Sequence, residues 1–177
     1  MAQEKKWFDN TIFVIVADHQ AGSAGKRALP VERYHIPLWI YSPAQIKPAV
    51  IRELASQIDI APTLLGILNM SYLSCFFGHD VLLSPPKRAL IANYQNLGLY
   101  DGKQLAILKP QEKIALQKGF RSRQIHEQVA GETISLVQRD ISYYQSAAYI
   151  YKNRINRWSS RHLVTIHTAV TEEPVRQ

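Results

Sequence analysis

The sequence has a single cysteine, Cys75, which excludes an internal disulfide framework and a cysteine-based zinc site. It has no apolar run of the roughly 18 to 20 residues that a transmembrane helix requires. Near the amino terminus, Asp9 and Asn10 interrupt the apolar residues that a signal peptide would need, so we expect no signal peptide. Internal repeats and low-complexity segments are also missing, which excludes a repeat architecture.

What remains is an ordinary globular composition. The 177 residues are 46% hydrophobic, enough to build the core of one domain and too many for a disordered chain. The net charge is +7, spread through the chain without a basic block. Such a balance suits a partner with phosphates or an anionic membrane surface, but it is equally common on proteins that bind neither. A buried-type strand begins almost at once, and we expect further sequence to precede it in the complete protein.

Residues 12–17 form an unbroken apolar run rich in β-branched side chains, which predicts a strand buried on both faces of a parallel sheet. Asp18 and His19 follow directly. Because ligands of open α/β sheets bind beyond the carboxyl ends of strands, this pair is well placed for metal chemistry. The alternative is structural: a capping Asp beside a hydrogen-bonded His.

A second short strand is expected at residues 38–41, with Pro37 at its first position and Pro43 closing it. His35 lies immediately before this strand. Its side chain either contacts a substrate or a metal ligand, or is satisfied by a loop carbonyl, and we favour the second interpretation.

A helix is predicted from Asp59, a good N-cap, to Asn69, a plausible stop, with Pro62 in its first turn. Its expected buried face consists of Leu64, Leu65, Ile67 and Leu68. Thr63, near the helix start, has the position of a possible nucleophile. Because no base lies near it in sequence, we favour a packing role at the helix start.

From Arg88 the pattern changes to short strands at residues 88–94, 97–100 and 104–108, with a tight hairpin favoured at Asp101-Gly102. This predicts a small antiparallel edge added to the parallel part. Residues 111–123 fit either a strand or a helix.

The last expected element is a long helix from about residue 133 to residue 158. It carries a continuous apolar stripe of Ile134, Val137, Ile141, Tyr144, Ala148, Tyr151, Ile155 and Trp158. The stripe could form a coiled coil or dock on the sheet, and we favour docking because tyrosine and alanine are poor coiled-coil seam residues. Residues 161–177 are expected to be a frayed or disordered tail.

Four blocks, in this order and spacing, resemble sulfatase-like enzymes of the alkaline phosphatase superfamily. They are residues 10–19 ending in Asp18-His19, residues 35–43 beginning with His35, residues 56–65 containing Asp59 and Pro62-Thr63, and residues 76–82 containing Gly78-His79-Asp80. The nearest branch is that of lipoteichoic-acid synthase and the phosphoglycerol and phosphoethanolamine transferases. The resemblance implies an α/β fold for residues 1–160: the C-terminal half of such a catalytic domain, with parallel strands, a small antiparallel edge and a long C-terminal helix.

The resemblance also implies the site. Asp18 and His19 would be two ligands of a divalent metal (Mn, Zn or Mg), and His35 would contact substrate or support the ligands. A threonine nucleophile and a further acidic ligand belong well upstream, and neither Thr11 nor Glu4 matches them. We therefore expect no catalytic nucleophile in this chain. We also expect only weak metal binding, since such sites use about three or four protein ligands.

The leading hypothesis is the C-terminal portion of a metal-dependent phosphoglycerol-type transferase or sulfatase-like hydrolase, inactive alone. Its substrate would be a phospholipid headgroup or another phosphate or sulfate ester. The parent would sit in the cytoplasmic membrane with a periplasmic or extracellular catalytic domain. Expected partners are the missing N-terminal half of the domain and, through exposed core, other copies of the chain, but not nucleic acid. The alternative is a basic module that binds anionic lipid headgroups or nucleic acid through Arg121, Arg123, Arg154, Arg157 and Arg161.

Overall fold

The structure, a computed structural model, describes residues 1–20, 29–121, 125–126 and 133–156. In chain order its elements are the 3-10 helices η1 (Ala2–Glu4) and η2 (Phe8–Asn10), strand β1 (Phe13–Val16), helix α1 (Val31–Tyr34), strand β2 (Leu38–Tyr41), 3-10 helix η3 (Gln57–Asp59), helix α2 (Ile60–Ile67), strands β3 (Ala89–Ala92), β4 (Leu97–Tyr100), β5 (Gln104–Leu108), β6 (Ile114–Lys118) and β7 (Ile125–His126), and helix α3 (Thr133–Lys152).

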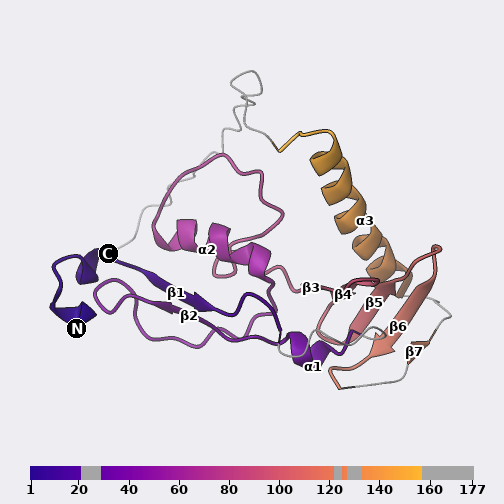
Figure 1. Ribbon diagram of the computed structural model, residues 1–177, viewed down its shortest axis with the longest axis horizontal. Helices are drawn as coiled ribbons and strands as arrows, with labels where there is room; N and C mark the ends of the chain where they lie inside the picture. Colours follow the sequence, from indigo (N-terminus) through magenta and orange to yellow (C-terminus); the bar gives the residue numbers. More distant parts are fainter. Residues whose placement is uncertain (21–28, 122–124, 127–132, 157–177) are drawn as a thin grey trace, which may run out of the picture.

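These elements form two lobes, which Figure 1 shows at opposite ends of an elongated molecule, with α1 on the side of the second lobe that faces the first. The amino-terminal lobe (residues 1–20 and 36–86) contains the two-stranded sheet β1-β2, with α2 beside it. The carboxy-terminal lobe (the described residues of 29–35 and 87–156) contains the five-stranded sheet β3-β4-β5-β6-β7 and α3. The predicted α/β class, the antiparallel edge and the long C-terminal helix are confirmed.

The carboxy-terminal lobe has the main core, because its sheet is covered on both faces. Side chains alternate along each strand, so Leu105 and Ile107 of β5 face one side and Ala106 faces the other. The first side packs against the segment leading into α1, in a cluster of Leu29, Val31, Ile91, Tyr100, Leu105, Ile107 and Ala115. The second packs against α3, in a cluster of Leu99, Ala106, Leu116, Leu136 and Val137.

The hairpin between β4 and β5 forms as predicted. Asp101 accepts hydrogen bonds from the backbone N–H groups of Lys103 and Gln104, and Gly102 adopts a φ of +97°. The undecided segment after residue 111 forms β6, which pairs antiparallel with β5.

The prediction of parallel strands is wrong for the described part of the chain, where every strand pair is antiparallel. β1 pairs with β2 in the register Phe13↔Tyr41 to Val16↔Leu38. β1 is also not buried on both faces, since Ile15 is 55% exposed and its cross-strand partner Trp39 is 58% exposed. An unbroken apolar run rich in β-branched residues predicts a strand whose side chains are buried. Its composition does not encode the direction of its neighbour, which depends on the connection.

Helix α2 ends at the predicted point but buries different residues. Asn69 lies in the left-handed region at φ 51°, and the N–H groups of Asn69 and Met70 donate to the carbonyls of Gly66 and Leu65. The buried residues of α2 are Pro62 and Thr63, whereas Leu68 of the predicted buried face is exposed. The leucine-rich face is left incompletely covered by the described residues.

Helix α3 docks on the sheet along its first half, as favoured from sequence. Val137 and Ile141 pack in the second core cluster. Farther on, α3 extends past the sheet (Figure 1), and Tyr151 is 80% exposed. The helix ends at Lys152, and Trp158 and the predicted tail lie outside the described residues. Among the described residues, no helix is both long and apolar enough to span a membrane.

Candidate metal-binding pair and its support

Asp18 and His19 follow the end of β1 and lie side by side in solvent. Their side chains are 89% and 67% exposed, and Asp18 Oδ1 lies 3.6 Å from His19 Nε2. The backbone N–H of His19 donates to the same carboxylate oxygen at 2.9 Å. The two side chains therefore present their polar atoms from one turn of the chain, as a shared ligand site requires.

The remaining contact of His19 decides which ring nitrogen is available. Nδ1 lies 2.8 Å from the carbonyl oxygen of Gln20, which can only accept, so Nδ1 carries the proton. In the neutral ring this leaves the lone pair on Nε2, the nitrogen that lies beside the Asp18 carboxylate. Histidines that bind metals commonly donate their other N–H to a carbonyl or carboxylate in this way.

An imidazole nitrogen and a carboxylate oxygen fit zinc or manganese, and a carboxylate also fits magnesium. Within the described residues, no third His, Cys, Asp or Glu joins this pair to form a ligand cluster. Asp18 and His19 thus fit a divalent metal as two members of a larger ligand set.

Gln57, which sequence reasoning missed, supports this turn through hydrogen bonds to its backbone. The side-chain Nε2 of Gln57 donates to the carbonyl oxygens of Ala17 at 2.8 Å and Asp18 at 3.3 Å. These contacts connect η3 to the exit of β1 across about 40 residues of sequence. A contact this distant leaves no local signal in the sequence.

Two residues after Gln57 lies Asp59, which forms a buried ion pair with Arg88. Asp59 is 1% and Arg88 0% exposed at the side chain, and the pair is bidentate, at 2.7 Å (Arg88 Nη1 to Asp59 Oδ2) and 2.9 Å (Nη2 to Oδ1). The backbone N–H groups of Ser56 and His79 also donate to the Asp59 carboxylate. Arg88 Nε donates to the Tyr143 hydroxyl at 3.3 Å, with the guanidinium over the Tyr143 ring.

Burial acts to raise the pKa of Asp59, but the hydrogen bonds from Arg88, Ser56 and His79, together with the Arg88 charge, outweigh burial and hold that pKa below its usual value. Asp59 is therefore ionised within a structural network. The predicted N-cap role is incomplete, because no side-chain cap bond of Asp59 to α2 forms. The carboxylate instead joins η3, the loop before Asp80 and the start of β3.

Thr63 serves the same network. Its hydroxyl donates to the Asp59 carbonyl at 2.7 Å and accepts from the Val81 N–H at 3.0 Å. Both contacts are structural, which agrees with packing at the helix start.

His35 follows α1, and its exposed ring meets the Phe120 ring edge-on at 6.1 Å between centroids. A role for His35 in substrate or ligand contact stays a prediction.

A second buried acid, Asp140 of α3, also escaped sequence reasoning. Its side chain is fully buried, and among the described residues neither carboxylate oxygen has a hydrogen-bond partner. Burial raises the pKa of Asp140 to about 7; the Leu99 backbone N–H opposes this without completing a hydrogen bond. The spacing of polar residues along α3 did not predict that the Asp140 side chain is buried.

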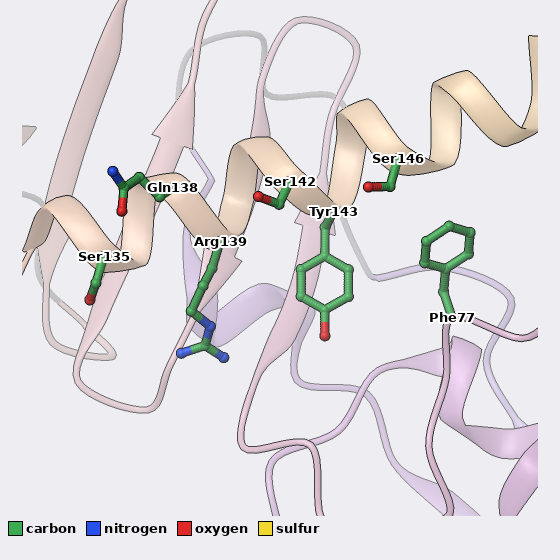
Figure 2. Close-up of a pocket in the computed structure, with 7 residues that line it drawn as sticks. All are labelled: Phe77, Ser135, Gln138, Arg139, Ser142, Tyr143 and Ser146. Atoms are coloured by element: carbon green, nitrogen blue, oxygen red, sulfur yellow. The ribbon is translucent and has the colours of Figure 1, made fainter.

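An open groove of about 440 Å³ follows α3 of the carboxy-terminal lobe, and Phe77 of the amino-terminal lobe also lines it (Figure 2). It is lined by Phe77, Ser135, Gln138, Arg139, Ser142, Tyr143 and Ser146. The groove does not include Asp18 or His19, and so is separate from the candidate metal pair.

Two comparisons with known proteins bear on the family and the fold of the chain. The sequence model of the family described as Sulfatase matches residues 1–70, the part that contains Asp18, His19 and Asp59. A crystal structure of a protein in the alkaline phosphatase superfamily from Vibrio parahaemolyticus matches with a TM-score of 0.75 and 26% sequence identity. The match covers 89% of this chain and 39% of that protein's chain, so this chain spans well under half of its structural relative.

The fold is thus that of the alkaline phosphatase superfamily. Within this superfamily, residues 1–70 are similar to the Sulfatase family.

Proposed function

We propose that the chain is the C-terminal portion of a metal-dependent catalytic domain, either a phosphoglycerol-type transferase or a sulfatase-like hydrolase. Its contribution to the active site is the pair of Asp18 and His19. The observation that carries this proposal is the adjacency of His19 Nε2 and Asp18 Oδ1, 3.6 Å apart and open to solvent, inside the sulfatase-matched region.

The residues of this chain would hold and orient one side of the metal. The hydrogen bond from Nδ1 to the Gln20 carbonyl leaves Nε2 of the neutral ring as the nitrogen that would bind the metal, and the Asp18 carboxylate supplies negative charge beside it. A divalent metal bound there would lower the pKa of a coordinated hydroxyl and neutralise charge on the ester oxygens of the substrate. The exposure of both side chains leaves space for substrate and for ligands from elsewhere.

The nucleophile and the remaining ligands would come from the N-terminal half of the domain. Two observations support this division: the chain covers 39% of its structural relative, and the face of β1-β2 that carries Ile15 and Trp39 is open. That face is apolar, as a surface made for burial is. By the resemblance to the phosphoglycerol transferases, the complete protein would be held in the cytoplasmic membrane with this domain outside it.

The test compares the chain alone with the chain co-expressed with the upstream half. Alone, it is expected to give no metal-dependent turnover of p-nitrophenyl phosphate, bis-p-nitrophenyl phosphate or p-nitrophenyl sulfate. With the upstream half, turnover of a phosphate or sulfate ester is expected, and Asp18→Ala is expected to abolish it. Asp9→Ala, a change at an exposed aspartate of η2, serves as the matched control.

Turnover by the chain alone that is lost in Asp18→Ala would show that the chain holds a complete site, contrary to the proposed division. Turnover by the reassembled domain that survives Asp18→Ala would refute the metal role of the pair.

A further inference from the structure

We infer that Gln57 is a positioning residue for the Asp18–His19 pair, an inference that rests on the proposed function. Its side-chain N–H groups reach both carbonyl oxygens at the exit of β1, Ala17 O at 2.8 Å and Asp18 O at 3.3 Å. The Cα of Asp18 lies between these two peptide groups, and His19 follows the second. Fixing them fixes the direction in which the Asp18 carboxylate and the His19 ring leave the strand.

The Gln57 hydrogen bonds matter because Asp18 and His19 have few other contacts that hold them in place. Both side chains are mainly exposed, and each described contact of His19 is with a neighbouring residue in the chain. Such local contacts move with the turn and do not anchor it. The two Gln57 contacts come from distant sequence and can hold the turn against the rest of the fold.

Gln57 is itself held in position because it is the first residue of η3, and the last residue of η3 is the buried Asp59. The Asp59 carboxylate accepts from the Ser56 N–H at 2.7 Å and is clamped by the buried Arg88. The Ser56 hydroxyl in turn accepts from the Leu90 N–H at 2.7 Å. Arg88 and Leu90 of the carboxy-terminal lobe therefore hold η3, and Gln57 of η3 in turn contacts the candidate metal pair.

The experiment uses the ¹⁵N-labelled 177-residue chain and Mn²⁺ as a paramagnetic probe. Two variants are compared: Gln57→Leu, which keeps the approximate side-chain size but removes the donors, and Gln45→Leu. Gln45 is a matched control, because its Nε2 also donates to a backbone carbonyl, that of Asp9 at 3.1 Å, away from the pair.

Two readouts are measured. Without metal, the backbone amide order parameters of residues 18–20 are expected to fall in Gln57→Leu from about 0.85 towards about 0.6, and to stay unchanged in Gln45→Leu. With Mn²⁺, the midpoint for broadening the His19 signals is expected to rise about fivefold in Gln57→Leu, the equivalent of one net hydrogen bond. Asp18→Ala is expected to remove this broadening.

Unchanged order parameters in Gln57→Leu, or a fall of the same size in Gln45→Leu, would overturn the positioning role whatever the metal result. A Mn²⁺ midpoint within twofold of wild type would overturn its relevance to the site. If Mn²⁺ leaves His19 unbroadened in the wild-type chain, the proposed metal function fails, while the metal-free order parameters still decide the role of Gln57.

Discussion

Replacing Arg88 by Met tests the network that joins the lobes. Methionine keeps much of the length of the side chain but removes every donor, so the buried Asp59 carboxylate loses both guanidinium hydrogen bonds and its counter-charge. Two backbone donors, Ser56 and His79, remain on it. The variant thus leaves a charged group in place without its main partner.

Breaking a buried pair by removing one partner costs about 3–5 kcal/mol, and we expect a loss of this size in the free energy of unfolding at pH 7. The loss should depend on pH. The folded-state pKa of Asp59 is lowered in the wild type, so its stabilisation is present above the unfolded pKa of about 3.9 and disappears as pH falls through the folded value. In Arg88→Met burial is no longer opposed by the guanidinium, and the gap to wild type should shrink below about pH 4.

The assay is urea unfolding followed by circular dichroism at pH 7 and pH 3.5. Arg88→Lys, which keeps the charge and loses the bidentate geometry, should fall between Arg88→Met and wild type. Arg52→Met, at an exposed position, should change stability by less than about 0.5 kcal/mol. An Arg88→Met variant within about 1 kcal/mol of wild type at pH 7, or a gap that widens in acid, would refute this account of the pair.

Three further outcomes are expected. Burial raises the pKa of Asp140 to about 7, so the neutral carboxyl contributes stability that is full below about pH 3.9 and lost as pH rises through 7. Urea unfolding should therefore find Asp140→Asn more stable than wild type at pH 8, by at most about 4 kcal/mol. At pH 4 the variant should be no more stable than wild type. In Gly78→Ala the new Cβ would meet the Ile58 carbonyl oxygen, costing about 1–3 kcal/mol by thermal melting, whereas Gly66→Ala, where the obstruction is the movable Asp80 carboxylate, should cost less. Light scattering should show self-association that persists from 50 mM to 500 mM salt, because exposed apolar surface drives it; a monomer that binds DNA or anionic vesicles with a steep salt slope would favour the basic-module alternative.

Features set by nearby residues could be predicted from the sequence. The Asp101-Gly102 hairpin, the Asn69 stop and the docked first half of α3 each depend on local turn chemistry or on a periodic face. The position of Asp18 and His19 after a strand follows in the same way from one apolar run.

The features that failed depend on partners distant in sequence. The direction of β2 relative to β1 is set by the connection through α1, and the exposure of Ile15 by what covers the sheet; neither is encoded in the strand itself. The roles of Gln57 and Arg88 depend on meeting residues about 30 to 40 positions away. No local pattern distinguishes this Arg from a solvated one until the fold brings Asp59 to it.

The Asp59–Arg88 pair also has a consequence for how the molecule comes apart. Two lobes at the ends of an elongated chain would ordinarily open independently, each with its own protection against hydrogen exchange. Here the opening of one lobe alone leaves a buried charge without its partner in the other lobe, a cost that complete unfolding avoids because water then solvates both charges. The amides of η3 and β3 should therefore exchange in one cooperative event, and the two lobes should behave as a single unfolding unit.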